Sequence, residues 1–222
     1  MASTPAELFD AIEAGDVERV QTILASEPAL ALRRDGEGVS ALMRARYRFD
    51  RAMVDAVRAA VPEFDVFEAA SFGDLDRLTQ LVEEDPSLAN ARSGDGFTAL
   101  HLPAFFGQVE AVRLLLERGA EVDARGTGWM IGTALHSAVS GRHPDAARAL
   151  LEAGADPNAR QAEGWTPLHS AVANADATTA RLLLAHRADA TATNEGGRSV
   201  LDLAREGGGE EVIEMVRGAL EA

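Results

Sequence analysis

The sequence contains no cysteine and no lysine, and only 5% of its 222 residues are aromatic. Without cysteine, disulfide bonds and thiolate metal sites are excluded. Without lysine, the chain has no side chain that can be acetylated or ubiquitinated, and all 21 basic residues are arginine. Because 46% of the residues are hydrophobic, the chain has enough apolar side chains for a core, and most of them are aliphatic.

Long hydrophobic runs and known catalytic motifs are absent as well. Residues 1–10 have no basic start and lead into no apolar run, so we expect neither a signal peptide nor a membrane span, which would need ~20 apolar residues. The patterns G-x-S-x-G, H-E-x-x-H and G-x-x-x-x-G-K do not occur. We therefore predict a cytoplasmic protein that is not an enzyme and needs no cofactor.

Positive charge is scarce outside one segment. The net charge is -15, which disfavours nucleic acid and anionic membranes as partners. Residues 33–58 differ, because seven arginines and four acidic residues give this segment a net charge of +3. The rest of the chain has a net charge of -18. Within this segment Arg44, Arg48 and Arg51 have helical spacing. They either form one basic face or pair with nearby acidic side chains, and in so acidic a chain we favour pairing.

What the sequence does contain is a repeated motif, most complete at Thr166-Pro167-Leu168-His169. Threonine or serine begins a degraded copy at positions 40, 98, 133 and 199, while Ala6 and Phe64 take the same place by helix pattern alone. Successive copies are 34, 24, 34, 35, 33 and 33 residues apart. This period and the T-P-L-H-x-A motif resemble the ankyrin-repeat family.

The resemblance implies an all-α solenoid of about seven helix-turn-helix repeats with short β-turn fingers. We expect a single domain over residues 1–222, because one repeat cannot bury its apolar face alone. The repeats are expected at roughly 5–36, 37–63, 64–94, 95–129, 130–162, 163–195 and 196–222.

The second repeat, 37–63, is truncated and lacks the finger that should separate it from the third. Its Phe49 stands where other repeats have glycine between their helices. Two further positions break the pattern. Pro103 should remove one backbone hydrogen bond from the first helix of its repeat, and Arg187 replaces a glycine at a helix end, so that turn should be strained or reshaped.

Three histidines, His101, His136 and His169, recur at the repeat period. Helices in neighbouring repeats lie ~8–10 Å apart, whereas zinc needs nitrogen ligands at ~2 Å. Equivalent histidines therefore cannot share one ion, and we predict no metal site. The family resemblance implies that these histidines form structural hydrogen bonds between repeats.

Ankyrin-repeat proteins bind partners with their fingertips and inner helices, so the resemblance implies a concave protein-binding surface. Aromatic residues precede the threonine in two fingers, and the finger before Thr133 is two residues longer than its neighbours and contains Trp129 and Met130. Either the fingertip aromatics bind a partner or they pack on adjacent fingers. The predicted partner-binding residues are Phe97, Phe105, Phe106, Arg125, Trp129, Met130, Arg160 and Trp165.

The predicted function is protein–protein recognition, as a scaffold, adaptor or inhibitor that acts as a monomer on another protein. One alternative is a small-ligand or enzyme-accessory module that uses a notch left by the missing finger of repeat two. A second alternative is a purely structural part of an oligomer.

Overall fold

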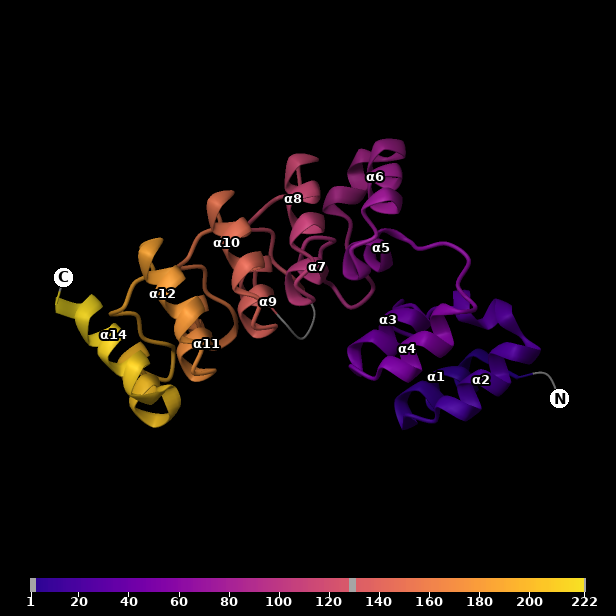
Figure 1. The fold of residues 1–222 in the computed structure, drawn as a ribbon, viewed down its shortest axis with the longest axis horizontal. Coiled ribbons are helices and arrows are strands. Elements are labelled where there is room, and N and C mark those ends of the chain that lie inside the picture. Colours follow the sequence, from indigo (N-terminus) through magenta and orange to yellow (C-terminus); the bar gives the residue numbers. More distant parts are fainter. Residues whose placement is uncertain (1–2, 128–130, 222) are drawn as a thin grey trace. The chain divides into compact units, whose positions relative to one another are not determined.

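The computed structural model describes residues 3–127 and 131–221, which form paired helices joined by short turns (Figure 1). By packing, the chain divides into two compact units. Unit 1 comprises residues 1–68 together with 93–95, and unit 2 comprises 69–92 and 96–222. The predicted single domain and the predicted limits of the repeats stay predictions.

Unit 1 consists of two stacked helix pairs. Helix α1 packs on α2 and α3, and α4 packs on α2 and α3. Its core is aliphatic, with Leu8, Ile12, Ile23, Leu42 and Met53 fully buried. The elements are α1 (Pro5–Ala14), α2 (Val17–Ser26), η1 (Pro28–Leu32), α3 (Ala41–Tyr47) and α4 (Arg51–Arg58), and the following α5 (Val66–Phe72) contains the boundary to unit 2.

Unit 2 repeats the same helix pair along the chain. The inner helices α7, α9, α11 and α13 pack side by side, and the outer helices α6, α8, α10, α12 and α14 form a second row (Figure 1). The elements are α6 (Leu75–Glu84), η2 (Pro86–Asn90), α7 (His101–Phe105), α8 (Val109–Glu117), α9 (Ala134–Ser140), α10 (Pro144–Glu152), η3 (Ala162–Gly164), α11 (Pro167–Ala173), α12 (Ala177–Ala185), α13 (Val200–Leu203), η4 (Ala204–Gly208) and α14 (Gly209–Glu221).

The fingers are short turns closed by isolated antiparallel bridges, such as Arg92 with Thr98 and Thr193 with Ser199. The predicted all-α repeat solenoid is thus confirmed as a fold class. The number of repeats stays a prediction.

Helices α1, α3, α11 and α13 each begin at a side-chain cap, whereas α7 begins without one. Thr166 accepts the N–H of His169, and Pro167 occupies the first helical position, where its missing N–H costs nothing. The two repeats with neither threonine nor serine at the expected place use a neighbouring residue. Thr4, two residues before Ala6, caps α1, and Asp65, one residue after Phe64, accepts the N–H of Glu68 at 2.8 Å.

Between its two helices, each repeat needs one residue with a left-handed backbone. Phe49, which stands at a glycine position of other repeats, adopts this backbone with φ 56°, and its side chain is 71% exposed. Arg187, which replaces a cap glycine, is also left-handed, with φ 67°. The residues with positive φ between the two helices of a repeat are Gly15, Phe49, Gly73, Gly107, Arg142, Ala175 and Gly209.

Pro103 shortens the first helix of its repeat. Helix α7 begins at His101, three residues after Thr98, whereas α9 begins directly after Thr133. Proline has no N–H to donate to the carbonyl of Ala99, so the first turn cannot close as an α-helix. The predicted loss of a backbone bond is confirmed.

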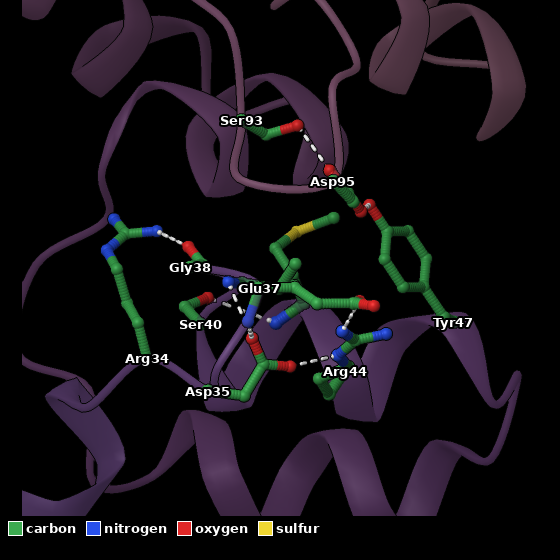
Figure 2. Close-up of polar contacts among 11 residues, drawn as sticks. Arg34, Asp35, Glu37, Gly38, Ser40, Arg44, Tyr47, Ser93 and Asp95 are labelled. Atoms are coloured by element: carbon green, nitrogen blue, oxygen red, sulfur yellow. Dashed lines mark hydrogen bonds and ion pairs between the residues drawn. The ribbon is translucent and has the colours of Figure 1, made fainter. Parts of the chain in front are cut away.

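The finger between repeats two and three is missing, because the chain runs through residues 59–65 straight from α4 into α5. Within unit 1, the tip of the next finger, Ser93–Asp95, packs on the finger that precedes α3. A side chain on Gly94 would overlap the carbonyl oxygen of Glu37. The hydroxyl of Tyr47 donates to Asp95 at 2.9 Å, and Ser93 donates to the other oxygen of the same carboxylate (Figure 2). The tip therefore occupies the place where a notch was expected.

A row of amide side chains ties the bases of successive fingers together in unit 2. Asn90 donates to the carbonyl of Gly119 and accepts the N–H of Glu121. Asn158 forms the same pair of bonds with Arg187 and Asp189.

Asp123 stands at the equivalent position one finger further along. It accepts the N–H of Asp156 at 3.0 Å, but a carboxylate has no N–H to donate to the carbonyl of Gly154. One bond of the row is therefore missing at this finger.

Asp123→Asn should therefore stabilise the protein by about 1 kcal/mol, because it restores that donor. The free energy of unfolding from urea titration measures the gain. The reverse change at the matched position, Asn158→Asp, should lower stability by a similar amount. An equal or lower stability of Asp123→Asn would contradict the role assigned to this row.

Ala175→Gly should also stabilise the protein, by about 0.5–1 kcal/mol, because Ala175 has φ 53° and glycine tolerates this backbone without strain. The same change two residues earlier, Ala173→Gly, removes a helix former from α11 and should cost up to about 1 kcal/mol. Thermal melts of the two variants should move in opposite directions, and parallel shifts would contradict the strain argument.

Candidate protein-interaction surface

The repeated histidines join each repeat to the next. Nδ1 of His101 lies 3.3 Å from the backbone nitrogen and 2.6 Å from the hydroxyl of Thr98, so it accepts hydrogen bonds. Nε2 then carries the proton and donates to the carbonyl of Gly132 at 3.0 Å. His136 bonds in the same way to Thr133 and to the carbonyl of Trp165. The predicted bonding between repeats is confirmed for these two.

His169 repeats only the first half of this pattern among the described residues, with Nδ1 2.8 Å from the hydroxyl of Thr166. Burial lowers the pKa of all three rings. It brings the pKa of His136 to about 4, from an ordinary value of 6.5. The histidines are therefore neutral structural groups at physiological pH.

The arginines after the finger bases also connect neighbouring fingers. The guanidinium of Arg92 donates to the carbonyl of Arg125 at 2.7 Å, and that of Arg160 donates to the carbonyls of Gly164 and Thr193. Arg125 reaches the carbonyl of Ile131 in its own finger at 3.5 Å. Arg125 and Arg160, predicted to be a polar rim for a partner, thus have structural bonds. Their role in binding stays a prediction.

The two fingertip aromatics pack on the histidines of their own repeats. The ring of Phe97 lies 5.7 Å from that of His101, and the ring of Trp165 lies 5.8 Å from that of His169. Phe97 is only 5% exposed, so it belongs to the core and offers a partner little surface. Trp165 is half-buried and keeps part of its indole at the surface.

Phe105 and Phe106 lie at the end of inner helix α7. Their rings meet edge to face, with centroids 5.2 Å apart, and both side chains are half-buried. The four residues before them in α7 are fully buried. In the equivalent places of α9 and α11 stand the small, exposed residues Ser140 and Ala173. The inner row therefore presents an aromatic pair beside a surface of small side chains.

With this geometry, the chain can be compared with known proteins. The family model described as "Ankyrin repeats (3 copies)" matches residues 66–161 and 154–219, which is more than half of the chain. The chain belongs to the ankyrin-repeat family.

Relatives of this ankyrin-repeat chain share short segments with it. The "Probable E3 ubiquitin-protein ligase XBOS31" of Oryza sativa subsp. japonica is 44% identical over 62 residues, which cover 28% of this chain and 14% of that protein. The "Ankyrin repeat and SAM domain-containing protein 6" of Rattus norvegicus is 37% identical over 76 residues, which cover 33% of this chain and 8% of that protein. The "Palmitoyltransferase Hip14" of Drosophila melanogaster is 34% identical over 101 residues, which cover 46% of this chain and 16% of that protein. The chain thus matches less than a fifth of each of these proteins.

The predicted site is only partly visible in this ankyrin-repeat structure. Trp129 and Met130, predicted as partner-binding residues in the lengthened finger, lie outside the described residues. The next residue, Ile131, is 44% exposed. Within the described ranges, no helix is both long and apolar enough to cross a membrane.

Two of the three arginines of repeat two pair with acidic side chains, as favoured from the sequence, and the third, Arg48, bonds to a backbone carbonyl. Arg44 forms ion pairs with Asp35 and Glu37 in the adjoining finger (Figure 2). Arg48 donates to the carbonyl of Glu13, and Arg51 lies 3.7 Å from Asp55. Although Asp35 is partly buried, the hydrogen bonds from Arg44 and from backbone N–H groups hold its pKa below the usual value. Arg44 and Arg48 therefore form contacts within unit 1.

The depressed histidine pKa values predict that acid destabilises the repeats. A His136 with a folded pKa of about 4 binds fewer protons than the unfolded chain, so its contribution is complete above pH 6.5 and is lost as the pH falls toward 4. The loss between pH 7.5 and 5 should be about 2 kcal/mol for this residue. Urea titrations across this range measure it. His136→Gln keeps one acceptor and one donor but cannot titrate, so its stability should depend less on pH. Equal pH dependence of variant and parent would contradict the assignment.

Proposed function

We propose that this chain is a protein-interaction module that binds a partner protein with the inner helices and fingertips of unit 2. It acts as an adaptor, scaffold or inhibitor and carries out no chemistry itself. The observation that carries the proposal is the pair Phe105–Phe106, two large aromatic side chains left half-exposed at the end of an otherwise buried helix. Aromatic residues, phenylalanine among them, are enriched at protein interfaces.

Membership of the ankyrin-repeat family supports the proposal, since repeat solenoids use their extended concave surface for binding. Stacking already occupies the polar groups of the fingers, as the bonds of Arg160 and His136 illustrate. Phe105 and Phe106 keep part of their side-chain surface exposed at the end of α7. Trp165, half-buried on a fingertip of the same unit, extends the proposed interface.

The small-ligand alternative has weaker support. Unit 1 contains a groove of about 640 Å³ between α2 and α4, but five alanines line it, and Gln21 and Asp55 are its only polar residues. Ligand sites usually combine an enclosed apolar cavity with several convergent polar groups.

The test is capture of partners from an extract of the native cells, with the captured proteins identified by mass spectrometry. The double variant Phe105→Ala/Phe106→Ala should reduce capture at least ~10-fold, because truncation of an anchor often costs ~2 kcal/mol or more. Leu32→Ala, which truncates a side chain 55% exposed in unit 1, is the control and should leave capture unchanged.

Circular dichroism melts accompany the capture assay, so that a loss of folding is not mistaken for a loss of binding. Undiminished capture by the folded phenylalanine double variant would show that the interface lies elsewhere.

A further inference from the structure

The three inner helices α7, α9 and α11 contain no aspartate, glutamate, lysine or arginine, although 26% of the residues of the chain are charged. Their three histidines are fully buried. The outer helices differ, because Arg113 of α8 forms an exposed ion pair with Glu152 of α10. A second exposed pair joins Arg181 of α12 to Glu211 of α14. The outer row is thus charged, and these inner helices are not.

The ends of the three inner helices lie side by side in unit 2 (Figure 1). A side chain on Gly141, directly after α9, would overlap the carbonyl oxygen of Phe105 in α7, so these two helix ends touch. The guanidinium of Arg142, in the same turn, donates to the carbonyl of Asn174 after α11 at 2.7 Å. The half-exposed pair Phe105–Phe106 therefore belongs to one surface with the ends of α9 and α11.

Beside the two phenylalanines this surface is built from small side chains. Ser140 and Ala173, the last residues of α9 and α11, take the place that Phe105 has in α7, and both are exposed. Two large rings thus border small residues that leave room for a bound segment. We call these four residues the inner surface: Phe105, Phe106, Ser140 and Ala173.

Arg142, Asp176 and Glu206, which follow the ends of inner helices, are bonded within the protein. Arg142 has the carbonyl of Asn174, and the carboxylate of Asp176 accepts the N–H and the hydroxyl of Thr179. Glu206 pairs with an arginine of its own repeat. A charged side chain of a partner, buried against the inner surface, would therefore lose water without gaining a counter-charge. The inner surface suits an uncharged segment.

The inner surface also favours one conformation of the bound segment. Backbone N–H and C=O groups of a helix bond within it, so α7, α9 and α11 offer no row of donors and acceptors of the kind that a sheet edge offers. An extended segment would bury its own backbone polar groups here without replacing their bonds to water. A helical segment makes these bonds internally and does not need them from the inner surface.

We propose that the inner surface binds an amphipathic α-helix of the partner protein through an uncharged, apolar face. Side chains of that face contact the rings of Phe105 and Phe106, and the backbone of the helix approaches Ser140 and Ala173 closely. Charged residues of the helix lie on its opposite side. This inference rests on the proposed function, because it names the chemistry of the partner at the same site.

The experiment selects binders to the full chain from two displayed libraries of peptides of ~18 residues, long enough for an isolated helix. The first library is helix-forming and is randomised on one face, at i, i+3, i+4 and i+7. The second has proline at every fourth position, which prevents a helix. Binders should come from the first library and carry apolar, uncharged residues on the randomised face. Charged faces, binders from the proline library alone, or no binder from the helical library overturns the proposal.

A single added charge tests where the selected, labelled peptide binds. Ala173→Glu places a carboxylate without a partner under the peptide, so fluorescence anisotropy should show at least ~10-fold weaker binding. Ala185→Glu is the matched control, because Ala185 is also an exposed last residue, in outer helix α12, and it should leave binding unchanged. Circular dichroism melts of both variants verify folding. Equal binding by the two folded variants contradicts the assigned site.

Salt dependence tests the uncharged character of the contact. Binding of the selected peptide to the parent chain should change less than ~2-fold between ~0.05 and ~0.5 M salt, because screening acts on charge pairs and the contact contains none. A loss of binding by ~10-fold or more over this range would show that charges carry the contact, and the proposal would be wrong.

Capture from native extract distinguishes this inference from the proposed function. If Phe105→Ala/Phe106→Ala loses the partner but the helical library yields no binder, the interface stands and its helical occupant is wrong. If a selected helix binds and Ala173→Glu weakens it, while the phenylalanine double variant keeps full capture, the helix-binding surface stands and the native partner binds elsewhere.

Discussion

The bond from one repeat's helix cap to the next repeat is the contact on which the stacking in this structure depends. In repeats four and five a histidine makes it, with Nδ1 on its own threonine and Nε2 on a carbonyl of the following finger, as His101 does with Gly132. The ring is rigid and neutral, and it satisfies two buried polar groups that would otherwise be costly to remove from water. One side chain thus closes a helix start and fixes the neighbouring finger.

Repeat two shows what happens where this histidine is missing. Met43 stands in its place and cannot form either bond. Ser40, the cap of α3, instead donates to the buried carboxylate of Glu68 at 2.6 Å, and Glu68 also accepts the N–H of Asp65. Burial, and after it the nearby charge of Asp65, raises the pKa of Glu68. The link between neighbouring repeats is kept, but a side chain of the following repeat accepts the bond, and this costs the burial of an acid.

The needs of stacking also decide which residues remain for a partner. Arginine and asparagine side chains along the fingers are bonded to carbonyls of the next finger, so charge and amide groups that look available in the sequence have structural partners. Phe97 is used in the same way, buried against His101. Among the aromatic side chains, those at the end of α7 and Trp165 on its fingertip are partly exposed.

The sequence by itself determined the features that depend on local backbone conformation. The period located the helix pairs, Pro103 predicted a lost backbone bond in α7, and the replacement of glycine marked the unusual turns at Phe49 and Arg187. Such features follow from the residue's own φ and from bonds within a few positions along the chain. The sequence also predicted that Arg44 pairs with nearby acidic side chains, which here belong to its own repeat.

Tertiary structure decided what depends on contacts about 30 or more residues apart. It moved Phe97 into the core, gave Arg160 the carbonyl of Thr193 as its acceptor, and placed Gly94 against Glu37 where a notch was expected. These outcomes depend on the spacing of adjacent fingers, because a shift of a few ångströms decides whether a side chain meets a carbonyl or water. A repeat period shows which residues are equivalent. It does not show which groups each side chain contacts in the adjacent finger.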